Sequence, residues 1–550
     1  MPEGQFKNLM YIFAKKSLII LKMVSGGGCP FAETVQVVDQ YCNYFHKPAD
    51  GAFGEALVSQ LSPTFQLDGL YGLDEFEFRL NSANGGLNYV SNDGLMTVES
   101  GTTSGAFSTL RSLRSVRYRP GQGSMCRITA MFPTGFTEGY QQVAGFINQS
   151  DILGVGYNFG DPSEPLSKRD EFAIVRRQNS KGEVAQFTID VAASGAETVT
   201  ITLNNVAFNV SVTAGSTEVN TAQLGNDSYT GWIVDYYGSE LFFTFDGPPI
   251  DLTGTFSISS TGTLSGTYTN LQNGMPPNDN WTYQSDFNID KLDGSGPSSM
   301  SIDPSKLNVF VIDFRWLGAG RIRYSIEDPA TGCIFPFHMD YYANQNTIPS
   351  ISNPSLRVGY GVVNAAPAIG TGENVIVQGA SMMGAIEGQV IRNTTTKSIS
   401  ISGDYGGSGL TANVEHCFLT LKNNRVAVPG KPNVLNQREL IINSISVAIK
   451  DNGASGDSLR ILVYKNAETA DVKTYQLLDT LMSYSETLTT MNSGQEGKRI
   501  ASYAISTNSD LTIDVTDLRI ILAPLETISI ALLSVNKIIT QSMGINFEVE

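Results

Sequence analysis

Hydrophobic and polar residues alternate along most of the chain from about residue 66 onward. This period of two is typical of β-strands that bury one face, because successive side chains of a strand point to opposite sides of the sheet. The clearest run is 198–203, where Val199, Ile201 and Leu203 fall on one face and threonines occupy the other. The pattern predicts an all-β protein.

Turn residues between alternating runs predict β-hairpins. The dipeptide Asn204-Asn205 suits a tight two-residue turn, and Gly238 marks the centre of a second hairpin. The strongest hairpin signal spans 306–332, where the sequence LGAG forms the turn. The apolar residues of its two strands are expected to share one face: Phe310, Ile312, Phe314 and Trp316 before the turn, and Ile322, Tyr324 and Ile326 after it.

Helical patterns are few. Short helices are expected in 33–45 and 53–61, in 216–224, and in 472–488. Charged residues make up only 16% of the chain, and Gly (54 residues), Ser, Thr and Asn replace them. Such a composition lacks the Glu, Lys, Arg and Ala that cover long solvent-exposed helices, and so it supports the β prediction.

The length of 550 residues exceeds what one hydrophobic core normally serves, so several domains are expected. A Gly, Pro and Asn-rich linker at 427–436 precedes a last set of evenly spaced strands. We predict a multi-domain β-sandwich protein of jelly-roll or lectin-like type, divided as follows: an N-terminal arm with short helices at 1–65, an interrupted β-sandwich at 66–182 plus 283–420, an inserted small β module at 183–282, and a C-terminal β-sandwich at 435–550.

The first 25 residues are basic and apolar, with two apolar runs separated by Lys15 and Lys16. Neither run approaches the roughly 20 apolar residues that a membrane-spanning helix needs, and no small-residue cleavage site follows them. Three interpretations stay open: an arm that docks on a neighbouring subunit, a processed or anchoring segment, or sequence upstream of a start at Met23. No membrane span is predicted.

The net charge of −17 argues against nucleic acid as a partner, because phosphate binding needs a basic surface. The one dense basic cluster is Arg111, Arg114, Arg117 and Arg119. A strand is expected over 115–120, and it would place Arg117 and Arg119 on one face. These two arginines are candidates for contact with the carboxylates of a partner protein or with a glycan.

The five cysteines are widely spaced, no CxxC occurs, and there are only three histidines. This pattern predicts buried free thiols rather than a disulfide framework or a zinc site. No cofactor is expected, since the chain has no phosphate-binding loop motif.

Two acidic clusters are candidates for chemistry. Glu75 and Glu77 would face the same side of a strand, as a glycosidase pair requires, and equally as an exposed polar face would show. A weak calcium candidate comprises Asp286, Asn288, Asp290 and Asp293, although Lys291 and Pro297 stand where an EF-hand needs Gly and Glu. With no GxSxG motif either, we predict a protein that is not an enzyme.

Several segments of the chain resemble virion structural proteins of large DNA viruses of algae and protists, and of some tailed phages. The resemblance covers roughly residues 90–390 and is carried by these segments: SVRYRPGQGSMCRITAMF (115–132), GVGYNFG (154–160), FAIVRR (172–177), LGAGRIRYSIEDPATG (317–332) and NPSLRVGYGV (353–362). Segment 195–215 resembles modules of phage tail and fibre proteins. In such proteins the β-sandwich serves assembly or host attachment, and no site residues carry over.

The resemblance implies a virion structural protein of giant-virus type: a minor capsid protein, a penton (vertex) protein or a spike component on the outer particle surface. Its expected partners are other capsid proteins and further copies of itself in a pentamer or trimer, with a host-surface glycan as a further ligand. A carbohydrate-binding adhesin or fibre is the alternative, ahead of a β-sandwich polysaccharide hydrolase.

Overall fold

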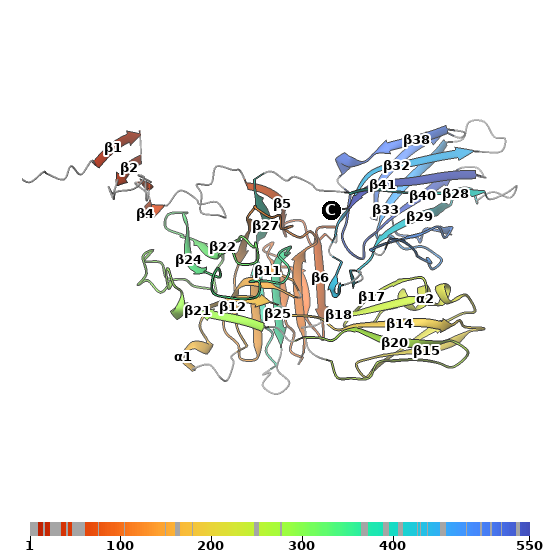
Figure 1. The fold of residues 1–550 in the computed structure, drawn as a ribbon, viewed down its shortest axis with the longest axis horizontal. Helices are drawn as coiled ribbons and strands as arrows, with labels where there is room; N and C mark the ends of the chain where they lie inside the picture. Colours follow the sequence, from red (N-terminus) through yellow and green to blue (C-terminus); the bar gives the residue numbers. More distant parts are fainter. Residues whose placement is uncertain are drawn as a thin grey trace, which may run out of the picture. The chain divides into compact units, whose positions relative to one another are not determined.

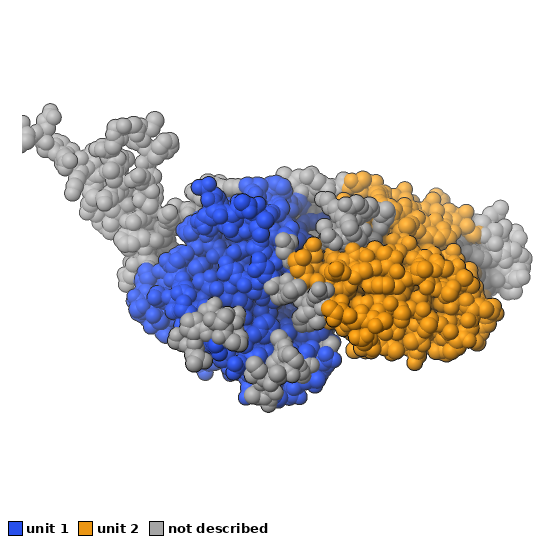
Figure 2. All heavy atoms as spheres, turned by 60° about the horizontal axis from the view of Figure 1, so that its bottom comes forward, with its two compact units in different colours: residues 1–180, 277–390 blue, residues 181–276, 391–550 orange. Residues whose placement is uncertain are grey.

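The computed structural model describes residues 61–550 apart from single or paired positions and seven longer gaps, together with four strands that precede residue 61. The longer gaps span 160–165, 247–251, 365–371, 389–394, 405–410, 451–457 and 535–539. The chain divides into two compact units (Figure 2). Unit 1 comprises residues 1–180 and 277–390, and unit 2 comprises residues 181–276 and 391–550.

Unit 1 is built on two antiparallel sheets (Figure 1). The first has the order β24 (Ile334–Asp340), β23 (Ile322–Glu327), β22 (Asn308–Phe314), β10 (Ser124–Ala130), β27 (Ser381–Glu387) and β5 (Leu61–Asp68). The second has the order β21 (Asn278–Tyr283), β13 (Ala173–Gln178), β12 (Ile152–Tyr157), β11 (Tyr140–Ile147), β25 (Val358–Asn364), β9 (Phe107–Ser112) and β6 (Phe78–Ala83).

The two sheets of unit 1 pack face to face as a sandwich around one core. Aromatic rings cross between them: Phe146 of β11 meets Phe314 of β22 at 5.4 Å between ring centroids, and Tyr324 of β23 donates its hydroxyl to Val175 O of β13 at 3.4 Å. A sandwich of two sheets requires this arrangement, because each sheet must bury one apolar face.

Smaller elements complete unit 1. They are a three-stranded sheet of β26 (Ile376–Gly379), β8 (Met96–Glu99) and β7 (Leu87–Val90), the short helix α1 (Leu166–Arg169), and a four-stranded sheet of β1 (Leu9–Ala14), β2 (Ser17–Lys22), β3 (Val35–Asp39) and β4 (Cys42–His46). The prediction of a helix over 33–45 is wrong, since β3 and β4 occupy that stretch. Pairing of β3 with both β2 and β4 decides for strands there. The helix expected in 53–61 falls almost wholly outside the described residues.

Unit 2 contains a β module and a β-sandwich. The module has two sheets and one helix: β17 (Trp232–Tyr237), β18 (Glu240–Phe245), β14 (Val184–Val191) and β20 (Ser265–Gln272) in one sheet, β16 (Val206–Val212), β15 (Glu197–Leu203) and β19 (Ser257–Ser260) in the other, and α2 (Thr217–Gly225). Helix α2 lies where the sequence predicts one, and Ser216 caps it by accepting a hydrogen bond from Val219 N.

The sandwich of unit 2 has two larger sheets and a separate hairpin. One sheet has the order β28 (Thr395–Asp404), β41 (Thr540–Val549), β32 (Leu440–Lys450) and β38 (Ser509–Asp514), with β39 (Ile521–Leu522) beside β32. The other has the order β34 (Gln476–Asp479), β35 (Met482–Ser485), β29 (Glu415–Asn423), β40 (Thr527–Ser534), β33 (Ser458–Lys465) and β37 (Arg499–Ser506), with β36 (Thr489–Thr490) beside β29. The hairpin joins β30 (Ala427–Val428) to β31 (Lys431–Leu435).

The predicted hairpins are confirmed with their registers. In β22 and β23 the apolar residues pair as Phe310 with Ile326 and Ile312 with Tyr324, all buried. Between β15 and β16, Asn204 and Asn205 both have positive φ (51° and 66°), the left-handed turn that asparagine tolerates better than most residues. Gly238 likewise turns between β17 and β18 with φ 52°.

One predicted domain boundary and one further predicted helix differ from the structure. Strands β28 and β29 pair with β41 and β40, so 395–423 belongs to the C-terminal sandwich and not to the interrupted one. Their alternation fits either sandwich, and only the pairing partners decide between them.

The predicted helix over 472–488 is also wrong, because β34 and β35 form there. No helix among the described residues is long and apolar enough to span a membrane.

We predict that Ile312→Ala lowers the unfolding free energy of unit 1 by about 2–5 kcal/mol, because Ile312 is fully buried at the centre of β22. Arg127→Ala on the neighbouring strand β10 is the control, since that side chain is exposed and should cost about 0.5 kcal/mol or less. Urea denaturation of the full chain measures both; equal effects would contradict the assignment of this face to the core.

Candidate functional site

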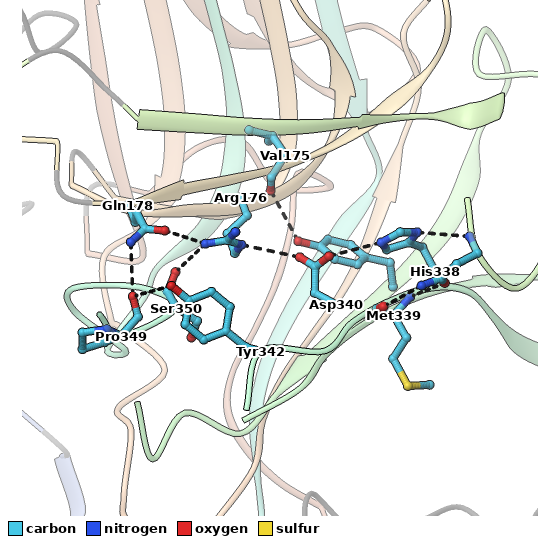
Figure 3. A network of polar contacts seen from close by, with 11 residues as sticks. Val175, Arg176, Gln178, His338, Met339, Asp340, Tyr342, Pro349 and Ser350 are labelled. Atoms are coloured by element: carbon cyan, nitrogen blue, oxygen red, sulfur yellow. Dashed lines mark hydrogen bonds and ion pairs between the residues drawn. The ribbon is translucent and has the colours of Figure 1, made fainter. Parts of the chain in front are cut away.

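An ion pair joins the two sheets of unit 1 near one end of the sandwich. Arg176 on β13 lies with its Nε 3.6 Å from Oδ2 of Asp340, the last residue of β24 (Figure 3). The two side chains are 11% and 22% exposed, so solvent screens the pair only in part. The charge of Arg176 therefore ties β24, an edge strand of the first sheet, to the second sheet.

Arg176 also holds the segment that follows β24. Its Nη1 donates to Gln178 Oε1 at 2.5 Å and to Ser350 O at 3.2 Å, while its Cζ lies 5.0 Å from the ring centroid of Tyr342. Gln178 in turn donates to Pro349 O at 3.2 Å. These contacts fasten both ends of segment 342–350 to strand β13 (Figure 3).

His338 supports Asp340 from the same strand. Its Nε2 lies 3.2 Å from Asp340 Oδ1, and its Nδ1 accepts a hydrogen bond from Asn288 N at 3.3 Å. Because Nδ1 accepts, Nε2 carries the proton and donates it to the carboxylate. The imidazole orients Asp340 in this arrangement.

Four loops meet at this end of the sandwich, and we call them together the loop platform: residues 113–123, 148 with 150–151, 315–321 and 341–357. Trp316 Nε1 donates to Ile351 O at 3.0 Å, and Ser350 N donates to Gly318 O at 2.9 Å. Leu317 N donates to the hydroxyl of Tyr118 at 3.1 Å. The loops thus hold one another through hydrogen bonds.

Asp151 anchors the far part of the long loop. Its carboxylate accepts hydrogen bonds from Ser352 N and Oγ, both at 2.6 Å, and from Asn353 N at 3.1 Å. Burial raises the pKa of Asp151, although these hydrogen bonds act in the opposite direction. Segment 341–357 is therefore fixed at both ends, by Arg176 and by Asp151.

The loop platform exposes three large apolar side chains. Leu317 is 57% exposed, Tyr341 is 61% exposed and Ile348 is 51% exposed. Residues 343–347 between the last two are exposed and include two asparagines and a glutamine. An apolar and amide-rich surface on a fixed support can bind a partner with little loss of conformational entropy.

The predicted contact residues Arg117 and Arg119 belong to this platform. They lie in loop 113–123, where the predicted strand is reduced to a single bridge from Val116 to Leu356. Both arginines are half-buried and have further contacts within the protein. Between them Tyr118 packs edge-on against Trp316 at 5.4 Å. The sequence pattern identifies the arginines, but it does not reveal the loops that gather around them.

The calcium candidates are engaged with the protein itself. Asp286 pairs with Lys168 at 2.6 Å, and Asn288 exchanges two hydrogen bonds with the backbone of Met339. Asp290 accepts from the backbone of Leu292 and Ser298, and Asp293 accepts from Ser295. Among the described residues no group of three or more His, Cys, Asp or Glu is placed to hold a metal ion.

The remaining candidate residues, Glu75, Glu77 and the cysteines, do not form a common site among the described residues. Glu75 lies outside the described residues, and Glu77 has a raised pKa because of burial and the nearby Asp74 and Asp68.

Cys126 and Cys417 are free and buried, as predicted. Cys333 is disulfide-bonded, which corrects the expectation of free thiols alone. Its side chain is half-buried and so accessible to a second sulfur, whereas those of Cys126 and Cys417 are enclosed in cores.

No family model and no curated protein matches this chain. Solved structures similar to it include lectin UEA-II complexed with galactose (11% identity, TM-score 0.20) and lectin II from Ulex europaeus (11%, 0.19), each covering 59% of this chain and 99% of its own. A triple jelly roll structure from the turret assembly of an archaeal virus covers 76% of this chain and 97% of its own, at 10% identity and TM-score 0.14. Similarities at this level carry no functional weight.

We predict that Arg176→Met frees segment 342–350 from β13, at a cost of about 1–3 kcal/mol in unfolding free energy. Amide hydrogen exchange over 341–350 should become faster. Arg177→Met is the matched control, because Arg177 bonds to Asp279 and Gln141 and makes no bond to the long loop. Unchanged exchange in 341–350 after Arg176→Met would show that the ion pair does not hold the loop.

Proposed function

We propose that the protein is a non-catalytic virion structural protein whose loop platform contacts a partner or the host surface. The observation that carries this proposal is the exposure of Leu317, Tyr341 and Ile348 on loops held in place by Arg176 and Asp151. Large exposed apolar side chains cost solubility, and a group of them on a fixed support is typical of an interaction surface.

The all-β organisation supports the same proposal. Sandwich domains place their loops at the ends of the strands, and such loops carry recognition on many β-sandwich proteins. Neighbouring copies or other capsid proteins could cover the edge strands β5 and β24 of the first sheet. The resemblance of segments within 90–390 to virion proteins adds a sequence reason for a minor capsid, penton or spike role on the outer particle surface.

A carbohydrate-binding adhesin is the second candidate. It is favoured by the exposed ring of Tyr341 and by the exposed amide residues Asn344, Gln345 and Asn346, which follow it in the same loop. Sugar rings stack on exposed aromatic side chains, and amides supply both donors and acceptors for their hydroxyls.

The structural role predicts that this chain is present on purified virus particles in a fixed copy number. Antibodies raised against unit 1 should label the outside of intact particles, and quantitative mass spectrometry should give a constant ratio to the major shell protein. Recovery of the chain only in the soluble fraction of infected cells would refute the structural role.

The platform itself is tested by the double substitution Tyr341→Ala and Ile348→Ala. We expect binding of particles to host cells, or of the full chain to its capsid partner, to fall at least about tenfold, the effect of losing roughly 1.4 kcal/mol. The control is Tyr71→Ala, which removes a tyrosine that is 95% exposed but lies outside the platform.

A glycan array then separates the two candidates. Binding of the full chain to a defined glycan, lost with Tyr341→Ala, would establish the adhesin role. Cell or capsid binding that depends on Tyr341 and is unaffected by competing glycans would support a protein partner instead.

A further inference from the structure

Unit 2 contains a lysine and an aspartate buried together where its two parts meet. Lys422 lies on β29 of the sandwich, and Asp235 lies on β17 of the module. Lys422 Nζ is 2.7 Å from Asp235 Oδ1, and the two side chains are only 6% and 4% exposed. Water therefore has almost no access to either group.

Burial disfavours the charged form of Lys422. The ring centroids of Tyr236 and Tyr475 lie 4.4 and 4.1 Å from Nζ, and the rings exclude solvent on their sides while their faces attract an ammonium. Burial lowers the pKa of Lys422, and Asp235 opposes this effect only in part. Nζ also donates to Tyr236 O at 2.6 Å, which fixes the direction of its remaining hydrogens and lone pair.

The carboxyl group of Asp235 is held and polarised by backbone amides. Oδ1 accepts from Tyr236 N at 2.8 Å, and Oδ2 accepts from Arg425 N at 2.7 Å. Backbone N–H groups in this position stabilise negative charge on a carbonyl oxygen during attack on its carbon. The pair thus combines a dry site, a fixed nitrogen and an activated carboxyl group.

We propose that Lys422 and Asp235 condense to an intramolecular isopeptide bond after folding. A proton first passes from Nζ to Oδ1 along their hydrogen bond, which leaves a neutral amine and a neutral acid. Nζ then attacks Cγ, and the oxygen that develops charge is Oδ2, which faces Arg425 N. The C–Oδ1 bond breaks, and Oδ1 leaves as water with one further proton from the nitrogen.

The reaction is a condensation and needs no oxidant, reductant or cofactor. Its driving force is proximity, because folding holds the nucleophile and the carboxyl group in contact. Exclusion of bulk water protects the amide from hydrolysis. The bond would close a loop between residues 187 positions apart and so join the module covalently to the C-terminal sandwich.

Intact mass spectrometry of the purified full chain under denaturing conditions tests the proposal. The chain should be lighter than its sequence mass by one water molecule. A protease digest should contain one branched peptide that joins the segment around Lys422 to the segment around Asp235. Chemical denaturation should leave the mass difference unchanged.

Three variants discriminate the covalent bond from a simple ion pair. Lys422→Arg keeps the positive charge but lacks the amine nucleophile, so its mass should equal the sequence mass. Asp235→Asn should instead lose one ammonia, because the amide leaves as ammonia on attack. Lys465→Arg, at the buried pair of Lys465 with Glu526 in the same sandwich, should still lose one water.

If the full chain still has its sequence mass after prolonged incubation under conditions in which it is folded, the proposal is overturned. The pair is then an ion pair only. Persistence of the water loss in Lys422→Arg would overturn it as well, because the missing water would then come from another site. Should that variant fail to fold, the branched peptide of the native chain still decides between the two outcomes.

Discussion

The packing of aromatic rings between the two sheets of unit 1 is the constraint on which the rest of that unit depends. Phe146 against Phe314, and Phe172 against Phe310 at 5.8 Å, fill the space between the sheets. With both sheets fixed, the ends of strands β13 and β24 are fixed as well. This fixed geometry lets Arg176 form its ion pair with Asp340 and its hydrogen bond to Ser350 O in the loop that follows β24.

Two of the ion pairs described above differ in their contact with solvent. The pair of Arg176 and Asp340 keeps partial contact with solvent and adds further hydrogen bonds, so both charges remain compatible with their surroundings. The pair of Lys422 and Asp235 is almost completely enclosed by protein and aromatic rings. Water stabilises neither charge in such a place, so the ammonium and the carboxylate depend on each other, on the two rings and on the backbone amides of Tyr236 and Arg425.

Much of the fold could be predicted from local pattern alone. Alternation identifies β15, β22 and β23, and the turn dipeptide Asn204-Asn205 identifies the hairpin between β15 and β16, because these features depend on neighbours in the chain. The helix predictions for 33–45 and 472–488 are wrong, because pairing with other strands decides the structure there: β3 pairs with β2, and β35 pairs with β29. The loop platform was beyond prediction, except for Arg117 and Arg119, because its members meet only through tertiary contacts between distant segments.

The chain passes from unit 1 to unit 2, back to unit 1 and again to unit 2, so each unit is made of two separated segments. During synthesis on the ribosome, residues 1–180 emerge long before the strands β22 and β23 with which they share a core. The module at 181–276 already contains every strand of its own two sheets and needs β29 only for the contacts of Lys422. Two incomplete sheets therefore coexist with open edges while the chain grows, a period in which chaperones or early assembly partners have the greatest influence on yield.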